Sequence, residues 1–566
     1  MGIKRFGLRL RDYAIRDTLG STESPAKGSI AIIDGPGLAH HVFYQLCDQR
    51  NADISYKACA DAAISWLKEL QYIGYKIEAI FFDGALPSSK KDVRIGRLQS
   101  YTERLWAYKQ TSGSTTPNFS GQTRKGLSPP PFMVFAIVEE LLLHADFRKV
   151  TFLVPGEADP YCAAAAQTLG EDSNTTIFSD DADLLVYRLG RSTDVVAFRD
   201  LSVSRNDSNI VWTAEKYSTS EIAKRSPTQI DDLIKPAYLM EKDPHMPFKQ
   251  ACHMLESTDP RKEPDFAQFE RAFQTTAEIK TWDEIRKRSI EERLASARDS
   301  RISEIIHQLE SSADDEASGG LRMYLPFILD DPSKKTSWNI GTGLRCLAYS
   351  LLLQHAGTSL GVQEYRRSGI RIASTPVEPL LEEEVAVQVK TLTTHIEQVL
   401  AWATENHGLS QADAWRCLVL QQVLSSLQAD GYTLPSLEDS VRIIPGDKEP
   451  SWQSVHLAGQ YEAAFYSFRM VKQVTAYVQS QSAKMSDHKG LAQQMEGLPS
   501  ISIFLTHSEL DKQAWNAIIG QVLSTLGEKD DSGEERPRKK ARKTKKDKKP
   551  QTAGLEKNPF AMLAND

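Results

Sequence analysis

The first 215 residues alternate short, almost wholly apolar β-type runs with amphipathic helical patterns. The runs predicted to be strands cover residues 29–33, 77–82, 150–154, 175–179 and 195–198. Helical patterns lie between them, for example over residues 60–71 and 132–144. Strands that alternate with helices are joined by crossover connections, which make neighbouring strands parallel. The sequence therefore predicts an α/β fold, with a parallel sheet covered by helices on both faces.

The chain divides by composition into four expected parts. These are an α/β domain (1–215), a charged helical connecting region that ends in a flexible linker (216–320), a helical domain (321–526) and a disordered basic tail (527–566). Residues 110–131 interrupt the first part with a stretch rich in Ser, Thr, Gly and Pro. A long segment of this kind inside a compact domain is either a functional loop or a disordered insertion.

Cysteine use and hydropathy argue against several classes of protein. The six cysteines are scattered, with no CxxC pair and no histidine at zinc-binding spacing. This pattern is typical of buried thiols in a reducing compartment. No apolar run approaches the roughly 18–20 residues that a membrane span needs. We expect no disulfide framework, no structural zinc site and no membrane association.

The charge of the chain is distributed very unevenly. Residues 536–549 hold ten Lys or Arg and one acid, a local charge of +9, which leaves −16 for the rest of a chain whose net charge is −7. Basic runs of this type act as nuclear import signals or as nucleic-acid-binding arms, and the plainer alternative is a solubilising tail. We expect a nuclear protein that binds an import receptor through residues 536–549.

Carboxylates stand at the ends of four predicted strands. They are Asp34, Asp83, the pair Glu157 and Asp159, and the group Asp180, Asp181 and Asp183. The carboxyl ends of parallel strands lie at one edge of a sheet, so these acids should converge there. A single Asp after a strand is more often a turn former or a helix cap. Four coincident placements instead favour a metal site, and oxygen ligands favour Mg²⁺ or Mn²⁺ over zinc.

The same motifs, in their order, resemble the flap endonuclease (XPG-type) superfamily of PIN-domain nucleases. They read Met-Gly-Ile, Ile-Asp-Gly, Phe-Asp-Gly, Gly-Glu-Ala-Asp and Ser-Asp-Asp-Ala-Asp, and they cover roughly residues 1–200. The later segments Tyr-Leu-Pro-Phe-Ile-Leu-Asp-Asp-Pro (324–332) and Leu-Arg-Cys-Leu-Ala-Tyr-Ser (344–350) look most like the asteroid branch. The resemblance implies a PIN-like nuclease domain over residues 1–215.

The resemblance also implies roles for individual residues. The metal ligands for two ions would be Asp34, Asp83, Glu157, Asp159, Asp181 and Asp183. Lys90 and Arg97, which follow Phe-Asp-Gly at the spacing seen in relatives, would hold the scissile phosphate, although they could equally belong to a solvated helix face. Asp243, in Leu-Met-Glu-Lys-Asp-Pro (239–244), would be a seventh ligand.

Two functional hypotheses follow. The first is a metal-dependent, structure-specific or single-strand endonuclease that acts on single-stranded or branched DNA, or on RNA, by a two-metal mechanism. The second is a catalytically inactive PIN-like scaffold that binds RNA or protein partners. The glycine-rich helix–turn–helix with which flap endonucleases grip duplex DNA is not recognisable here, which favours the scaffold. The complete set of core carboxylates favours the enzyme.

Overall fold

The structure is a computed structural model. It describes residues 3–49, 54–112, 117–119, 121–170, 173–206, 209–228, 230–311, 320–444, 451–481, 489–506, 508 and 510–528. Most of the expected linker at 310–320 and nearly all of the expected tail at 527–566 lie outside these residues. The same holds for the basic run at 536–549.

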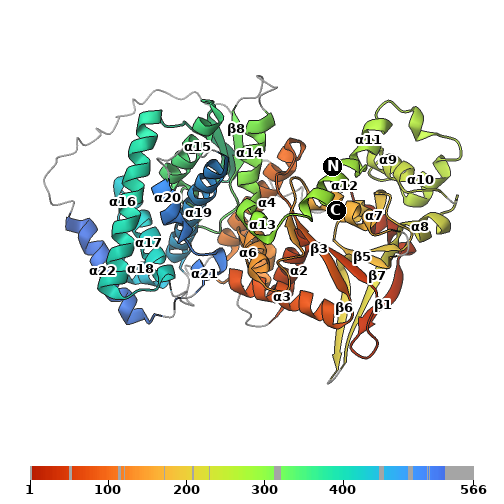
Figure 1. Ribbon diagram of the computed structural model, residues 1–566, viewed down its shortest axis with the longest axis horizontal. Coiled ribbons are helices and arrows are strands. Elements are labelled where there is room, and N and C mark those ends of the chain that lie inside the picture. Colours follow the sequence, from red (N-terminus) through yellow and green to blue (C-terminus); the bar gives the residue numbers. More distant parts are fainter. Residues whose placement is uncertain are drawn as a thin grey trace, which may run out of the picture. The chain divides into compact units, whose positions relative to one another are not determined.

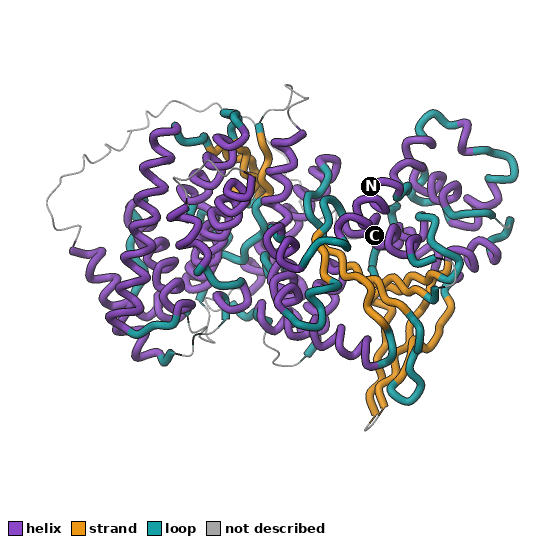
Figure 2. The backbone as a smooth tube through the Cα atoms, in the orientation of Figure 1, coloured by secondary structure: helices purple, strands orange, loops and turns teal. Residues whose placement is uncertain are grey.

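The centre of the first domain is a seven-stranded sheet with the order β1-β7-β6-β5-β2-β3-β4 (Figures 1 and 2). The strands are β1 (Ile15–Ser21), β2 (Ile30–Asp34), β3 (Lys76–Phe82), β4 (Thr151–Leu153), β5 (Thr175–Phe178), β6 (Thr193–Asn206) and β7 (Asn209–Ser218). The five strands from β6 to β4 are parallel to one another, whereas β7 and β1 are antiparallel to their neighbours. The five predicted strands and the α/β fold class are confirmed.

Helices cover both faces of this sheet, as its apolar strands require. One face carries α2 (Gly35–Asp48), α3 (Tyr56–Tyr72) and α6 (Met133–Leu143), and the other carries α7 (Ala158–Thr168) and α12 (Thr276–Ile285) (Figure 1). Strand β2 shows why, because Ala31, Ile32 and Ile33 are all fully buried although successive side chains point to opposite faces. The sheet is therefore held between two apolar layers.

The antiparallel edge was not predicted from the sequence. Strand β1 reads Ile-Arg-Asp-Thr-Leu-Gly-Ser, and four of its seven residues are exposed, so it lacks an apolar run. Strand β7 pairs with β1 and with β6 through main-chain hydrogen bonds. Its mixture of polar and apolar residues does not predict this pairing. Only the tertiary pairing makes these segments strands.

The expectation that residues 110–131 form a long structureless segment is wrong in part. Helix α4 (Lys91–Ser112) enters this stretch, and α5 (Gly121–Leu127) lies inside it. Helix α5 packs on α2, and a Cβ at Gly121 would lie 2.2 Å from the carbonyl oxygen of Cys47. Lys125 forms an ion pair with Asp48 at 2.8 Å. Glycine is thus required at this contact, where α5 meets the backbone of α2.

The rest of the described chain is mainly helical. Its helices include α8 (Thr219–Arg225), α9 (Ile234–Lys242), α10 (Phe248–Met254), α11 (Phe266–Ala272), α13 (Ile290–Ser296), α14 (Ser300–Ser311), α15 (Thr342–Ala356), α16 (Glu382–His407), α17 (Gln411–Ala429), α18 (Leu437–Arg442), α19 (Trp452–Gln481), α20 (Lys489–Glu496), α21 (Ile501–Phe504) and α22 (Lys512–Glu528). Helix α19 packs against α15, α17 and α20 and is buried along most of its length. Among the described residues, none of the helices is both long and apolar enough to cross a membrane.

A second, three-stranded sheet was also not expected. It has the order β10-β9-β8 and consists of β8 (Leu321–Tyr324), β9 (Val362–Ser368) and β10 (Arg371–Val377). Strands β9 and β10 contact α4, so this sheet lies against the α/β domain. Up to Leu523 the chain forms one compact unit, and the expected boundaries at 215, 320 and 526 stay predictions. All six cysteines are free, and five of them are buried.

Candidate metal centre

Six of the predicted ligands are positioned by the ends of the parallel strands. Asp34 is the last residue of β2, and Asp83 directly follows β3. Glu157 and Asp159 stand at the beginning of α7, shortly after β4. Asp181 and Asp183 belong to the turn and 3-10 helix (Ala182–Val186) that follow β5. All four strands are parallel neighbours, so their acids reach the same edge of the sheet.

Asp34 is the buried centre of the group. It is 8% exposed, and its Oδ2 accepts a 2.8 Å hydrogen bond from the hydroxyl of Ser179. Burial and the negative charge of Asp83 raise the pKa of Asp34 to about 7, although the bond from Ser179 acts in the opposite direction. Gly37, in the first turn of α2, leaves room for this carboxylate, because a Cβ at Gly37 would lie 2.5 Å from Asp34 Oδ2.

Asp83 and Glu157 are held by a backbone amide and a lysine. The amide of Ala158 donates a 2.8 Å hydrogen bond to Asp83 Oδ1. Lys90 forms an ion pair with Glu157, and both side chains are about one third exposed or less. Burial alone would lower the pKa of Lys90, but the contact with Glu157 and the charge of Asp159 outweigh it and raise that pKa. Lys90 is therefore a cation whose charge is fixed among the carboxylates.

Asp159 is the acid on which the charges of four other acids act. Its Oδ1 is buried and has no hydrogen-bond partner among the described residues. Burial raises the pKa of Asp159 well above its usual value, and so do the charges of four other acids, which are Asp34, Asp181, Asp83 and Glu157. Negative charges from all four strand ends thus act on one side chain. The acids after these four strands therefore lie within electrostatic reach of Asp159.

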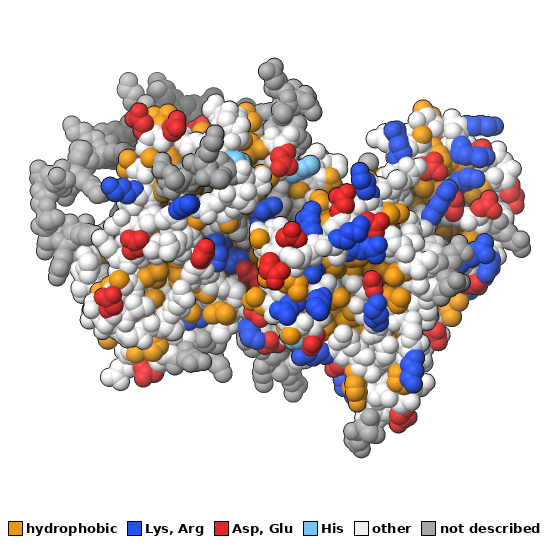
Figure 3. Space-filling model, in the orientation of Figure 1, with side chains coloured by type: hydrophobic (Ala, Val, Ile, Leu, Met, Phe, Trp, Pro, Cys, Tyr) orange, Lys and Arg blue, Asp and Glu red, His pale blue; other side chains and the backbone are white. Residues whose placement is uncertain are grey.

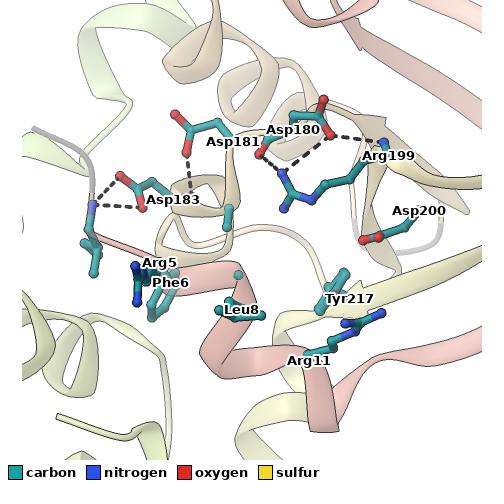
Figure 4. A pocket seen from close by; sticks show the side chains of 13 residues that line it. Arg5, Phe6, Leu8, Arg11, Asp180, Asp181, Asp183, Arg199, Asp200 and Tyr217 are labelled. Atoms are coloured by element: carbon teal, nitrogen blue, oxygen red, sulfur yellow. Dashed lines mark hydrogen bonds and ion pairs between the residues drawn. The ribbon is translucent and has the colours of Figure 1, made fainter. Parts of the chain in front are cut away.

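Asp181 and Asp183 connect the group to the beginning of the chain. Asp181 Oδ1 accepts a 2.9 Å bond from the amide of Asp183, and Asp183 Oδ2 accepts a 2.9 Å bond from the amide of Ile3. Burial and the charge of Asp181 raise the pKa of Asp183 to about 7, and Glu241 adds to the effect. Both aspartates line a cavity of about 510 Å³ (Figure 4).

The remaining predicted residues occupy different positions. Asp243 directly follows α9 and accepts a 2.9 Å hydrogen bond from the amide of His245. Its charge acts on Arg9, where it counteracts the lowering of the pKa by burial. Glu241, near the end of α9, is an acid whose charge acts on Asp183. The role of Asp243 as a seventh ligand stays a prediction.

Arg94 of α4 acts on one of the acids, Asp83, but was not identified as a site residue from the sequence. The charges of Lys90 and Arg94 lower the pKa of Asp83, against the burial that raises it. The side chain of Arg94 is only 14% exposed and forms an ion pair with Glu304 of α14. Arg97 is exposed and lines a neighbouring cavity. The spacing of Lys90, Arg94 and Arg97, four and three residues apart, is the signal that could have identified Arg94.

Whether the site suits a metal ion can be tested on the donor atoms. In the described part of the chain, no three Asp, Glu, His or Cys side chains stand close enough together to hold a metal ion as they are now placed. In these positions the acids contact Ser179, Ala158, Lys90 and Ile3. The donors are all carboxylate oxygens, one of them on Asp159 is buried without a partner, and their charges oppose one another. This chemistry fits a hard divalent cation, which would relieve the repulsion.

Comparison with known proteins agrees with the arrangement of these acids. The family described as "XPG domain containing" matches residues 129–378. Asteroid homolog 1 of Schizosaccharomyces pombe is 24% identical over 386 residues, which are 66% of this chain and 65% of the relative. The resemblance to the asteroid-type, XPG-like nucleases is confirmed. The chain spans slightly less than two thirds of that relative's length.

The XPG-like match extends beyond the large sheet. It begins just before α6, contains Glu157, Asp159, Asp181 and Asp183, and ends just after β10. The second sheet and the elements that connect it to the α/β domain are thus part of the matched region. Asp34 and Asp83 lie before it, and the parallel sheet places them beside the four matched acids.

Proposed function

We propose that this XPG-like chain is a divalent-metal-dependent endonuclease that cleaves phosphodiester bonds in single-stranded or branched DNA. The observation that carries the proposal is Asp159, whose buried oxygen has no partner among the described residues and whose pKa is raised by burial and by four other carboxylates. A structural scaffold gains nothing from such repulsion, whereas a phosphodiesterase uses it to attract cations.

The roles proposed for the residues follow from their positions. Asp34, Asp83, Glu157 and Asp159 would surround one Mg²⁺ or Mn²⁺ ion, and Asp181 and Asp183 would help to hold a second. Bound ions of this kind activate water and stabilise the leaving oxygen of an in-line displacement. Lys90 stands at the edge of the group and would release Glu157 to neutralise charge on the phosphate. Arg97 would contact the strand next to the scissile bond.

Two adjoining cavities, the first of which is lined by Asp83, favour an unpaired strand as the substrate. They have volumes of about 280 and 250 Å³, and they share Arg97, Tyr101 and Ser128. His40 lines the first, while Tyr44 and Arg104 line the second. Aromatic rings stack on bases and arginines contact phosphates, as in proteins that bind single strands. Cavities of this size accept single nucleotides rather than a duplex.

The face of the molecule in Figure 3 shows cationic and anionic side chains interspersed rather than separated. Nucleic-acid contact would therefore be local, as the acidic charge of the chain outside residues 536–549 also predicts. RNA is the alternative substrate, because stacking and phosphate contacts do not discriminate between the sugars. The basic run at 536–549 would bind a nuclear import receptor, and its deletion would move a fluorescent fusion protein out of the nucleus.

The second candidate is the inactive PIN-like scaffold for RNA or protein partners. The observation that favours it is the spread of the carboxylates, since no three of them in the described residues could hold a metal ion in their present positions. Lys90 would then act as a permanent substitute for the cation. The two candidates differ in one property, which is metal-dependent cleavage.

The test is cleavage of labelled single-stranded, flap and duplex DNA, and of RNA, with Mg²⁺ or Mn²⁺. Asp159→Asn keeps the shape of the side chain but removes its charge, and we expect it to slow cleavage at least about 100-fold. Asp61→Asn, at an exposed acid of α3 that pairs with Lys57, is the matched control. Equal cleavage by wild type and Asp159→Asn would refute this active site. Folded wild-type protein that cleaves none of the substrates would favour the scaffold.

A further inference from the structure

The cavity beside Asp181 and Asp183 is lined by three arginines that the proposed mechanism does not use. They are Arg5 and Arg11, from the first segment of the chain, and Arg199, from β6. In Figure 4, Asp180, Asp181 and Asp183 lie along the upper side of the view, and Arg5, Phe6 and Leu8 lie below them. The cavity has a volume of about 510 Å³, which is enough for a phosphate and its sugar.

The guanidinium groups of these three arginines are exposed, and the charged partners of Arg11 and Arg199 are distant. The side chain of Arg5 is exposed and forms no hydrogen bond or ion pair with any described residue. Arg11 lies 4.0 Å from Glu215 and is 66% exposed, and Arg199 lies 3.7 Å from Asp180 and is 55% exposed. Exposed pairs at such distances contribute about 0–1 kcal/mol. A phosphate that accepts two N–H groups from one guanidinium can therefore replace them.

The backbone of the first segment is shaped around this cavity. Arg5 has φ 60° and ψ 26°, and no other non-glycine residue in the described ranges has a positive φ. This left-handed conformation costs about 1 kcal/mol or more and persists where other contacts impose it. One such contact is the bond from the amide of Ile3 to Asp183. The strain thus falls on the residue that presents a free guanidinium to the cavity.

Gly7 brings the third arginine close to the same segment. A Cβ at Gly7 would lie 2.9 Å from the Cβ of Ala182 and 3.3 Å from Nη2 of Arg199. Arg199 Nη1 also donates a 3.2 Å hydrogen bond to the carbonyl oxygen of Asp180. The guanidinium of Arg199 is consequently held between the beginning of the chain and the turn after β5, beside the metal-binding acids.

The cavity lies on the opposite side of the acidic edge from Lys90. Lys90 follows β3, whereas Arg199 belongs to β6, and the order of the intervening strands is β6-β5-β2-β3. Three strand spacings of about 4.8 Å separate these strands, a distance of roughly 14 Å. At about 3.4 Å per nucleotide along a stacked strand, this corresponds to roughly four nucleotides. A strand that crosses the acidic edge would reach both cationic groups.

We propose that Arg5, Arg11 and Arg199 form a phosphate-binding subsite, which holds the substrate strand on the β6 side of the metal centre. The inference rests on the proposed function, because the strand is the one that the metal centre cleaves. The cavity also contains Asp180 and Asp200, so an isolated anion gains little there. A phosphate of a strand already bound at the acidic edge arrives at high effective concentration, and the arginines then fix its position.

The subsite is tested by the salt dependence of binding to a fluorescent ten-nucleotide DNA strand, with Ca²⁺ in place of Mg²⁺. Each phosphate contact on a single strand contributes about 0.7 to the slope of log K against log salt concentration. We expect Arg199→Ala and Arg5→Gly each to reduce this slope by about 0.7, and Arg199→Lys to preserve it. Arg5→Gly removes the backbone strain, so its thermal stability should equal or exceed that of wild type.

Arg188→Ala is the matched control, since Arg188 is exposed and lies 3.7 Å from Asp232, outside the cavity. Equal slopes for wild type, Arg199→Ala and Arg5→Gly would overturn the subsite, while cleavage lost in Asp159→Asn would still uphold the nuclease. Slopes that depend on these arginines without any cleavage would uphold the subsite and overturn the nuclease. A wild-type protein that neither binds nor cleaves DNA would overturn both.

Discussion

Asp34 gives the sharpest prediction about the energetic cost of the acidic centre. In the folded protein its pKa is raised from 3.8 to about 7 by burial and by Asp83. Between these two values the folded state keeps the proton and the unfolded chain has lost it, so stability falls as the pH rises through this window. A change in pKa of this size corresponds to roughly 4 kcal/mol at pH 8.

The variant Asp34→Asn removes this charge and can still accept the hydrogen bond from Ser179. When Asp34 ionises in the folded protein, neighbouring carboxyl groups bind part of the released proton, which lowers the cost of its charge. We therefore expect the variant to be about 2–4 kcal/mol more stable than wild type at pH 8. At pH 4 the variant and wild type should differ by less than about 1 kcal/mol, because Asp34 is protonated in the folded state and is still nearly half protonated in the unfolded chain, where its pKa is 3.8. The difference should appear progressively between pH 4 and pH 7.

The measurement is urea unfolding in EDTA at several pH values from 4 to 8, with Asp61→Asn as the control for a carboxylate outside the cluster. Added Mg²⁺ should stabilise wild type more than Asp34→Asn, by about 2.7 kcal/mol when the ion is at 100 times its Kd. A variant that is less stable than wild type at pH 8, or a difference independent of pH, would refute the reasoning. The repulsion would then not be present in the folded protein.

Two further predictions concern the residues around the acids. Gly37→Ala places a Cβ 2.5 Å from Asp34 Oδ2, so we expect a loss of about 1–3 kcal/mol in urea unfolding, whereas Gly96→Ala, which meets no atom within 4 Å, should not destabilise. Arg94→Met leaves the carboxylate of Glu304, 9% exposed, without its partner, and should cost about 3–5 kcal/mol. Adding Glu304→Gln to Arg94→Met should recover part of this loss in a double-mutant cycle. A cost below about 1 kcal/mol for Arg94→Met would show that the pair is not buried in solution.

The sequence alone was sufficient to predict features that depend on short segments of the chain. Apolar runs such as residues 77–82 can be buried only in a covered parallel sheet, and a parallel sheet places every carboxyl end at one edge. The position of six acids at this one edge could therefore be predicted from the sequence; they are Asp34, Asp83, Glu157, Asp159, Asp181 and Asp183. The predicted strands agree with the observed ones to within two residues at most ends, although β6 continues to Asn206.

Features that depend on long-range packing could not be predicted in this way. Strands β1 and β7 are polar and become strands only because each finds a partner edge. Arg94 reads as part of a solvated helix face, because Glu304 lies more than 200 residues further along the chain. The assignment of Asp243 used a weak local motif, whereas the position of α9 brings Glu241 within the electrostatic reach of Asp183.

The sequence by itself thus determined the α/β fold class and the acids at the strand ends, because burial and strand direction follow from short segments. Only the tertiary structure decided how these acids are held and which cations accompany them. Charge interactions depend on distance and burial rather than on order along the chain. The beginning of the chain illustrates this. The amide of Ile3 donates a hydrogen bond to Asp183, which is 180 positions further along the chain, and Arg5 lines the cavity that Asp183 also lines.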